Sequence, residues 1–251
     1  MPASSAAARE QIWNQAQLQN RVQTPAFRMW RYRLPAVVLG YSQRRLMQEV
    51  DARTGLEVLR RDSGGGAVLT GPWMLGLSVA LPPEHALLGT SLTGSYQWLG
   101  ALIAHTLQEC NVPAEAVSPQ DVRDRANACP TTNLSWACFG GLSPWEVLSN
   151  GRKIAGLAQV RRSNGVLLVG GVLLNQSPWE LLCQTLSRPP CEAKQLAETT
   201  THCLAGSGNA FDPALFEKRL YRGIRTCLQQ DTATRRKGLA PSSEVGAGGL
   251  A

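Results

Sequence analysis

Residues 59–82 read "LRRDSGGGAVLTGPWMLGLSVALP" and place three consecutive glycines between a pair of arginines and a long apolar run. In the apolar run, Leu75, Leu77, Val79 and Leu81 alternate with small residues, which is the period of a β-strand with one buried face. Glycine permits positive φ angles and lacks the Cβ that keeps a ligand away from the main chain. The stretch therefore predicts a glycine-rich connection between strands. It fits either a surface on which a ligand lies or a plain turn.

Composition restricts the class of protein. The chain has 251 residues, of which 43% are hydrophobic and 17% charged, as expected for a globular protein with a sizeable core. The net charge of +7 invites a nucleic-acid interpretation, but the arginine pairs are scattered and no nucleic-acid-binding motif accompanies them, so we expect no nucleic-acid partner. The seven cysteines lack a CxxC pair and indicate reduced thiols, and we expect no metal site.

The chain also lacks the sequence features of membrane insertion and secretion. No apolar run reaches the roughly 18 to 20 residues that span a membrane. Residues 1–13 lack the apolar stretch of a signal peptide. We therefore expect a cytoplasmic protein with no membrane partner.

Helical periodicity appears in several segments. It predicts helices over residues 6–22 and 91–110, where apolar residues, Leu92 among them, recur at spacings of three and four. Asp212 precedes Pro213 and is the expected cap of a last helix that ends near Leu228. Ser177, Pro178 and Glu180 have the spacing of a capping box at the start of another helix.

Strand signals alternate with these helices. The dipeptides at residues 150–151 and 164–165 are both Asn-Gly, which favours type I′ hairpin turns and an antiparallel meander. Residues 111–135 are polar and rich in proline and are expected to form a long loop. Together these patterns predict helices combined with an antiparallel sheet. We expect a disordered tail over residues 231–251, which are rich in glycine, alanine and serine.

Lysine is rare in this chain. There are only four lysines against 21 arginines, so most positions that need only positive charge carry arginine. An ammonium, unlike a guanidinium, can lose its proton when it is buried and act as a base or nucleophile. Lys153, near the start of the predicted middle strand of the meander, is therefore a candidate site residue.

Three segments carry a family resemblance: "RRDSGGGAV" at residues 60–68, "WACFGGLSPWE" at residues 136–146 and "GRKIAGLAQVRR" at residues 151–162. Together with "PAVVLGYSQ" they resemble the biotin/lipoate protein ligase family, in its lipoate branch, over residues 8–228. The resemblance implies a single catalytic domain over residues 1–230, with an α+β fold and a mixed, largely antiparallel sheet around an acyl-binding tunnel. It also implies attachment of octanoyl or lipoyl groups to a lysine of lipoyl carrier domains, such as the glycine-cleavage H protein and dehydrogenase E2 subunits.

The family includes two chemistries. The segment around Cys138 resembles the transferases, which carry the acyl group as a cysteine thioester and need no cofactor. The alternative is a ligase that uses ATP and Mg²⁺ to form an acyl-adenylate, for which Lys153 and the glycines suffice. A third alternative is a non-catalytic protein that binds the acyl group or its carrier.

The candidate catalytic residues are Cys138 and Lys153. A thiol with a pKa of about 8.5 needs a base or a cationic neighbour at neutral pH. Lys153, fifteen positions later, is the best local partner, either neutralised by burial or charged beside the thiolate. The expected substrate-binding residues, which the resemblance places on the glycine-rich turn and the later strand, are Arg60, Arg61, Ser63, Gly64, Gly65, Gly66, Ala67, Gly156 and Ala158.

The chain departs from the common family pattern in two places. Most members carry a histidine where this sequence has Thr70, and another where it has Gly170. A transferase subgroup that moves octanoyl groups from the glycine-cleavage H protein also lacks the first histidine, although the same absence fits a weakened active site. The cysteines assigned to the core are Cys110, Cys183, Cys191, Cys203 and Cys227, and Cys129 is unassigned.

Overall fold

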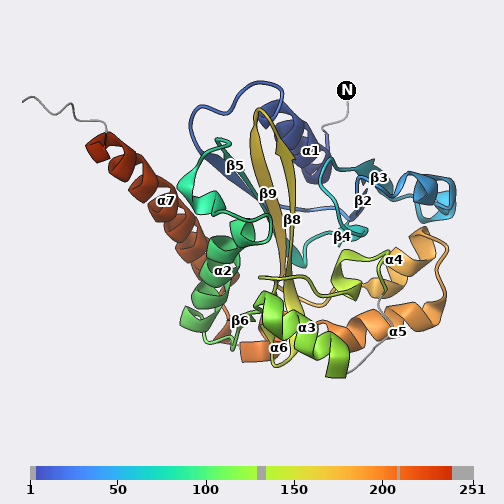
Figure 1. Ribbon diagram of the computed structural model, residues 1–251. Helices are drawn as coiled ribbons and strands as arrows, with labels where there is room; N and C mark the ends of the chain where they lie inside the picture. Colours follow the sequence, from blue (N-terminus) through green and yellow to red (C-terminus); the bar gives the residue numbers. More distant parts are fainter. Residues whose placement is uncertain (1–3, 129–133, 208–209, 239–251) are drawn as a thin grey trace, which may run out of the picture.

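The computed structural model describes residues 4–128, 134–207 and 210–238, which form two β-sheets surrounded by helices (Figure 1). Neighbouring strands of the six-stranded sheet are all antiparallel. Its strands, in spatial order, are β1 (Ala26–Arg31), β5 (Met74–Leu81), β9 (Gly165–Leu173), β8 (Arg152–Arg162), β7 (Val147–Ser149) and β6 (Glu115–Ala116).

The second sheet has three strands and carries the glycine-rich turn. In it β2 (Ala36–Leu39) pairs parallel with β3 (Glu57–Arg60) and antiparallel with β4 (Val68–Thr70). The glycine-rich segment therefore connects β3 to β4 on opposite sides of β2. The predicted α+β class with a mixed, largely antiparallel sheet is confirmed.

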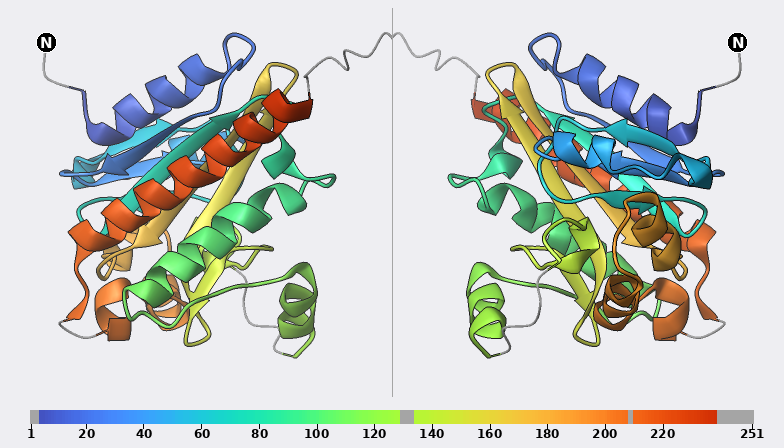
Figure 2. Two further views of the ribbon diagram at one scale, coloured as in Figure 1. Left: turned by 90° about the vertical axis from the view of Figure 1, so that its left-hand side faces the viewer. Right: turned by 90° about the vertical axis from the view of Figure 1, so that its right-hand side faces the viewer.

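Helices cover the sheets from different sides. One face of the large sheet packs against α2 (Gln97–Glu109) and α7 (Pro213–Gly238), whose residues Ile103 and Phe216 are fully buried (Figure 2). The small sheet shares a second core with α1 (Ala6–Gln17), α4 (Trp179–Thr185) and α5 (Pro190–Thr199). The remaining helices are α3 (Pro119–Ala128) and the short α6 (Cys203–Ser207).

The strand β5 is buried on both faces, whereas its alternating sequence predicts burial of one face only. All eight residues of β5 are buried. Leu75 and Leu77 belong to the core beneath α2 and α7, whereas Ser78 on the other face accepts a hydrogen bond from Trp30 Nε1. The position of β5 between β1 and β9, with a core on each face, explains why its small residues are also buried.

Both predicted hairpins are confirmed, but only one has the predicted turn. Asn150 and Gly151 have φ angles of 49° and 76°, as a type I′ turn requires, and they connect β7 to β8. At the second hairpin Arg162 pairs with Gly165, so the turn residues are Ser163 and Asn164, whose φ angles are not positive. The first hairpin sets Lys153 at the second residue of β8, as predicted.

Several helix ends differ from the predictions. Helix α1 ends at Gln17 rather than at residue 22, because the chain then turns and Val22 N donates to Asn164 O. Helix α2 begins only at Gln97, which leaves Leu92 exposed at 61% instead of buried.

The last helix begins as predicted and continues further. Asp212 caps α7 by accepting a hydrogen bond from Ala214 N at 2.8 Å. The helix extends to Gly238 rather than ending near Leu228. Residues 239–251 of the predicted tail lie outside the described residues.

The expected loop over residues 111–135 contains β6 and α3. Ser118 Oγ accepts from Asp121 N, and Asp121 in turn accepts from Ser118 N, which is a capping signal that identifies the start of α3. At α4, by contrast, the capping box is not formed. The cap residue is Pro178, and the hydroxyl of Ser177 is buried without a hydrogen-bond partner among the described residues.

None of the helices in the described ranges combines the length and hydropathy needed to cross a membrane.

Candidate functional site

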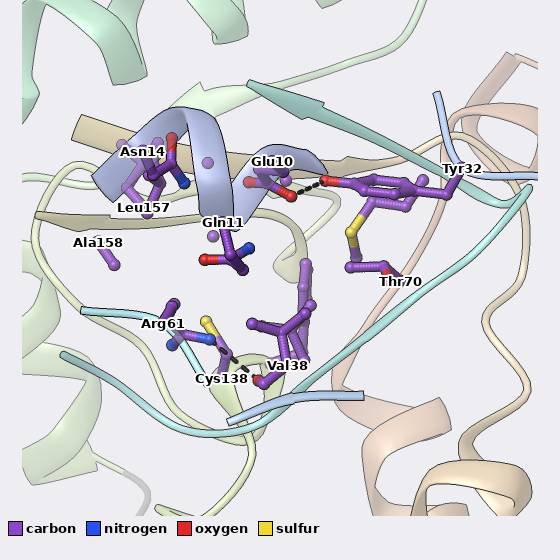
Figure 3. Close-up of a pocket in the computed structure, with 17 residues that line it drawn as sticks. Glu10, Gln11, Asn14, Tyr32, Val38, Arg61, Thr70, Cys138, Leu157 and Ala158 are labelled. Atoms are coloured by element: carbon purple, nitrogen blue, oxygen red, sulfur yellow. Dashed lines mark hydrogen bonds between the residues drawn. The ribbon is translucent and has the colours of Figure 1, made fainter. Parts of the chain in front are cut away.

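A cavity lies between the two sheets and beneath α1 (Figure 3). Much of its wall is formed by apolar side chains of the strands, namely Val38, Val68, Met74, Leu157 and Val169. Four of the predicted site residues line it: Cys138, Arg61, Gly156 and Ala158. The structure thus brings together residues from the glycine-rich segment, the cysteine segment and β8.

Cys138 begins a single 3₁₀ turn (Cys138–Gly140) that holds its thiol at the cavity. A Cβ on Gly156 would lie 3.4 Å from Cys138 Sγ, so the glycine in β8 leaves the space that the sulfur faces. Cys138 is partly exposed, and among the described cysteines it alone lines this cavity. Its position therefore suits a nucleophile.

The other described cysteines are less suited to nucleophilic attack. Burial raises the pKa of the Cys183 thiol to about 11 and also raises the pKa values of Cys110, Cys203 and Cys227. Cys191 is exposed, which corrects its assignment to the core. Cys129 lies outside the described residues.

The glycine-rich turn is hydrogen-bonded through its backbone to the cysteine segment. Ala67 N donates to Trp136 O at 2.6 Å, and Cys138 N donates to Ala67 O at 2.9 Å. A Cβ on Gly66 would lie 2.5 Å from Ala137 C and 2.7 Å from Cys138 N, so only glycine permits this approach. Gly65 has a φ of +90°, whereas a Cβ on Gly64 would meet nothing within 4 Å.

Arg61 fixes the same turn and forms part of the cavity wall. Its guanidinium donates to Val38 O, Gly64 O and Gly66 O at 3.2, 2.9 and 2.7 Å. Burial lowers the pKa of Arg61, while the neighbouring Cys138 and Glu10 side chains oppose that shift. Arg61 therefore places a buried positive charge beside Cys138 (Figure 3).

The remaining residues of the glycine-rich segment lie outside the cavity lining. Arg60 is exposed at the end of β3. Ser63 is buried, and its hydroxyl has no hydrogen-bond partner among the described residues. Gly64 and Gly65 are exposed, and Ala67 is buried behind Cys138. These residues contribute to the turn rather than to the cavity wall.

Lys153 is buried behind the cavity wall, in contact with the cysteine segment. Its ammonium donates to Cys138 O at 2.6 Å and to Gly141 O at 2.8 Å, and it pairs with Glu146 Oε2 at 2.7 Å. The side chains of Lys153 and Glu146 are only 5% and 3% exposed. Because an ammonium has three N–H donors, these contacts occupy all of them.

Glu146 is a site residue that the sequence analysis missed. Besides its ion pair with Lys153, its carboxylate accepts from Ser143 N at 2.7 Å and from Leu157 N at 3.2 Å. It therefore connects the cysteine segment to β8. The signal that could have identified it is an acidic residue inside the cysteine segment, eight residues after Cys138.

The two positions that lack the family histidines also line the cavity. Thr70 donates through Oγ1 to Ala36 O at 3.1 Å, so its hydroxyl joins β4 to β2. A Cβ on Gly170 would lie 2.9 Å from Leu157 Cδ2, so a larger residue would require Leu157 to move. The surrounding residues therefore fit Thr70 and Gly170 in place of the family histidines.

The other end of the cavity is polar, which the sequence also did not reveal. Glu10, Gln11 and Asn14 of α1 line this end together with Tyr32. The Tyr32 hydroxyl donates to Glu10 Oε2 at 2.7 Å. Burial raises the pKa of Glu10 to about 7, against the opposing effects of the Tyr32 hydrogen bond and the Arg61 charge.

Comparison with known proteins identifies relatives of this chain. The sequence profile of the lipoyl protein ligase A/B catalytic domain matches residues 2–204. The chain is 30% identical to Octanoyltransferase LipM of Brevibacillus brevis over 68% of this chain and 62% of that protein. It is 29% identical to Octanoyltransferase LipM of Carboxydothermus hydrogenoformans over 76% of this chain and 68% of that protein. The chain thus spans about two thirds or less of the length of these relatives.

A solved structure shares the fold. A bipartite lipoate protein ligase from Thermoplasma acidophilum superposes with a TM-score of 0.64 and 19% sequence identity, over 88% of this chain and 78% of that chain. The mixed sheet arrangement with packed helices is therefore the fold of lipoate-protein ligase catalytic domains.

The first prediction concerns the approach of Gly66 to the Cys138 backbone. Gly66→Ala should lower the free energy of unfolding by about 1–3 kcal/mol, because the new methyl group collides with backbone atoms. It should also accelerate hydrogen exchange of the Cys138 amide, which donates to Ala67 O. Gly64→Ala is the matched control and should change neither quantity appreciably. Equal effects of the two substitutions would contradict the assigned role of Gly66.

The second prediction concerns the pH dependence of stability. The pKa of Glu10 is about 7 in the folded protein against 4.5 as its ordinary value, so the folded state retains a proton that the unfolded chain has lost. This contribution to stability is complete below about pH 4.5 and is lost as the pH rises through about 7. Glu10→Gln keeps an acceptor for Tyr32 without the charge, and should be more stable than the wild type by roughly 1–3 kcal/mol near pH 8.

Urea denaturation across this pH range measures the effect of Glu10. The exposed Glu57→Gln is the control and should follow the wild-type curve. If the stability difference between Glu10→Gln and the wild type does not change with pH, Glu10 does not titrate as described.

Proposed function

The chain belongs to the family of lipoyl protein ligase A/B catalytic domains, and we propose that it transfers an octanoyl group, or a lipoyl group, to a lysine of a lipoyl carrier domain through a thioester on Cys138. The observation that carries this proposal is the partly exposed Cys138 thiol in a largely apolar cavity, beside the buried cation of Arg61. The relatives named Octanoyltransferase LipM support transfer of octanoyl rather than ATP-dependent ligation.

The reaction has two steps. The Cys138 thiolate attacks the carbonyl carbon of an acyl group on a donor carrier; the new C–S bond forms as the bond to the donor breaks, and the departing donor group takes a proton. The neutral ε-amine of the acceptor lysine then attacks the thioester. An amide C–N bond forms, the C–S bond breaks, and the lysine nitrogen releases its extra proton to solvent while the thiolate is regenerated. This route consumes neither ATP nor Mg²⁺.

Cys138 and Lys153 have different roles in this proposal. Cys138 is the catalytic residue, and Arg61 lines the cavity beside it with a buried positive charge. Lys153 is a positioning residue: its three N–H groups are engaged by Cys138 O, Gly141 O and Glu146, which leaves no donor for an acyl carbonyl. This role replaces the sequence-based expectation that Lys153 acts on the thiol itself.

The acyl group would lie along the apolar wall of the cavity, in contact with Gly156 and Ala158. We propose the glycine-cleavage H protein and dehydrogenase E2 subunits as the carriers, because both present a lipoyl lysine. The described cysteines are free thiols, as is usual for proteins of a reducing compartment, so we propose the cytoplasm as the location.

The proposed function predicts transfer that depends on Cys138 and not on ATP. The purified protein is incubated with an octanoylated donor carrier and an apo lipoyl domain, and intact mass spectrometry measures the modified acceptor. Wild type and Cys191→Ala should transfer without ATP, whereas Cys138→Ala should be inactive but folded. Modification from free octanoate or lipoate only when ATP and Mg²⁺ are added would support the ligase alternative. A protein that binds carrier and transfers nothing under either condition would support a non-catalytic role.

A further prediction separates positioning by Lys153 from its contribution to stability. Lys153→Met leaves the Glu146 carboxylate buried without its partner and should destabilise the fold by about 3–5 kcal/mol. The double variant Lys153→Met/Glu146→Gln removes both charges and should recover much of that loss. The double variant should nevertheless acylate Cys138 at least tenfold more slowly than the wild type, because the Cys138 and Gly141 carbonyls lose their common donor. Wild-type acylation by the folded double variant would exclude the positioning role.

A further inference from the structure

The cavity has two chemically different ends. Cys138 and Arg61 lie at one end, and the Glu10–Tyr32 pair lies at the other, with Gln11 projecting between them (Figure 3). Apart from Gln11 and Thr70, the wall between the ends is largely apolar and includes Val38, Leu157 and Val169. A hydrocarbon that extends from Cys138 along this wall therefore meets polar groups at its far end.

These polar groups are enclosed by the protein. Glu10 and Asn14 are only 7% and 6% exposed, so α1 covers this end of the cavity. The carboxylate of Glu10 accepts the Tyr32 hydroxyl, but Asn14 Oδ1 has no hydrogen-bond partner among the described residues. A hydrocarbon pressed against these groups would exclude water without supplying a hydrogen bond, which is unfavourable for buried polar atoms.

The Tyr32 hydroxyl occupies space that a glycine in the large sheet leaves open. A Cβ on Gly76 of β5 would lie 1.9 Å from the Tyr32 hydroxyl oxygen, so glycine at this position leaves the space that the hydroxyl occupies. Gly76 faces Trp30 of β1 in the strand register, two residues before Tyr32. The sheet therefore leaves room for the Tyr32 hydroxyl at the place where it donates to Glu10.

We propose that Glu10, Asn14 and Tyr32 form a stop that limits the length of the acyl chain carried by Cys138. The inference rests on the proposed function, because it takes the apolar wall to be the acyl site. A chain that ends before these residues is covered mainly by apolar side chains. A longer chain must displace or cover the polar groups of α1 and Tyr32, so it should acylate Cys138 more slowly.

The test measures acylation of Cys138 by linear saturated acyl thioesters from hexanoyl to tetradecanoyl. The wild type should show a maximum within the series and a decline of roughly tenfold or more for the longest chains. Glu10→Leu/Tyr32→Phe replaces the polar pair with apolar groups of similar shape and should shift the maximum to longer chains, with little change for the shortest. Asn14→Leu is a second, independent variant with the same expected direction. Gln15→Leu, on the exposed side of α1, is the matched control and should keep the wild-type profile.

Calorimetric binding of the corresponding free fatty acids makes the stop testable apart from catalysis. A length limit in binding that the double variant relaxes, without any acylation of Cys138, would retain the stop and reject the proposed transfer. Acylation with the same chain-length profile in wild type, Asn14→Leu and the double variant would overturn the stop and retain the transfer. A wild type that prefers chains ending in a hydroxyl over plain chains of equal length would also overturn it, because the polar end would then bind a polar group.

Discussion

A buried lysine whose three N–H donors are all engaged determines the geometry around the thiol. Lys153 joins the carbonyls of Cys138 and Gly141 to the carboxylate of Glu146, and Glu146 in turn accepts from the backbone of β8. Burial of such a pair costs desolvation free energy that its attraction only partly offsets, so its contribution is better described as positional than as net stabilisation. The pair fixes the cysteine segment against the strand that borders the cavity.

The glycine-rich turn provides the second constraint on Cys138. Gly66 allows the turn to approach the cysteine segment closely enough for backbone hydrogen bonds, and Arg61 fixes the carbonyls of the turn from the other side. The thiol is thus held by Lys153 from one direction and by the turn from another. The mobile part of the proposed reaction is therefore the acyl group and its carriers, because the backbone on both sides of Cys138 is already bound.

The sequence predicted local features better than contacts between distant segments. The Asn150–Gly151 turn signal placed Lys153 correctly because hairpin geometry depends on neighbouring residues. The partnership of Lys153 with Glu146 depends on the tertiary arrangement of the cysteine segment and β8, which no local pattern encodes. Glu10 was missed for a related reason: a carboxylate on a polar helix is normally solvated, and only packing of α1 over the cavity buries it.

The acyl-enzyme is the species on which this account depends, and its detection is the most direct test. The wild type is mixed with an octanoyl thioester donor in the absence of acceptor, digested at low pH and mapped by mass spectrometry. We expect a single octanoyl group on the peptide that contains Cys138, and neutral hydroxylamine should remove it, as it does for a thioester. An octanoyl group on another residue, or an acylated species that forms only with ATP, would contradict it.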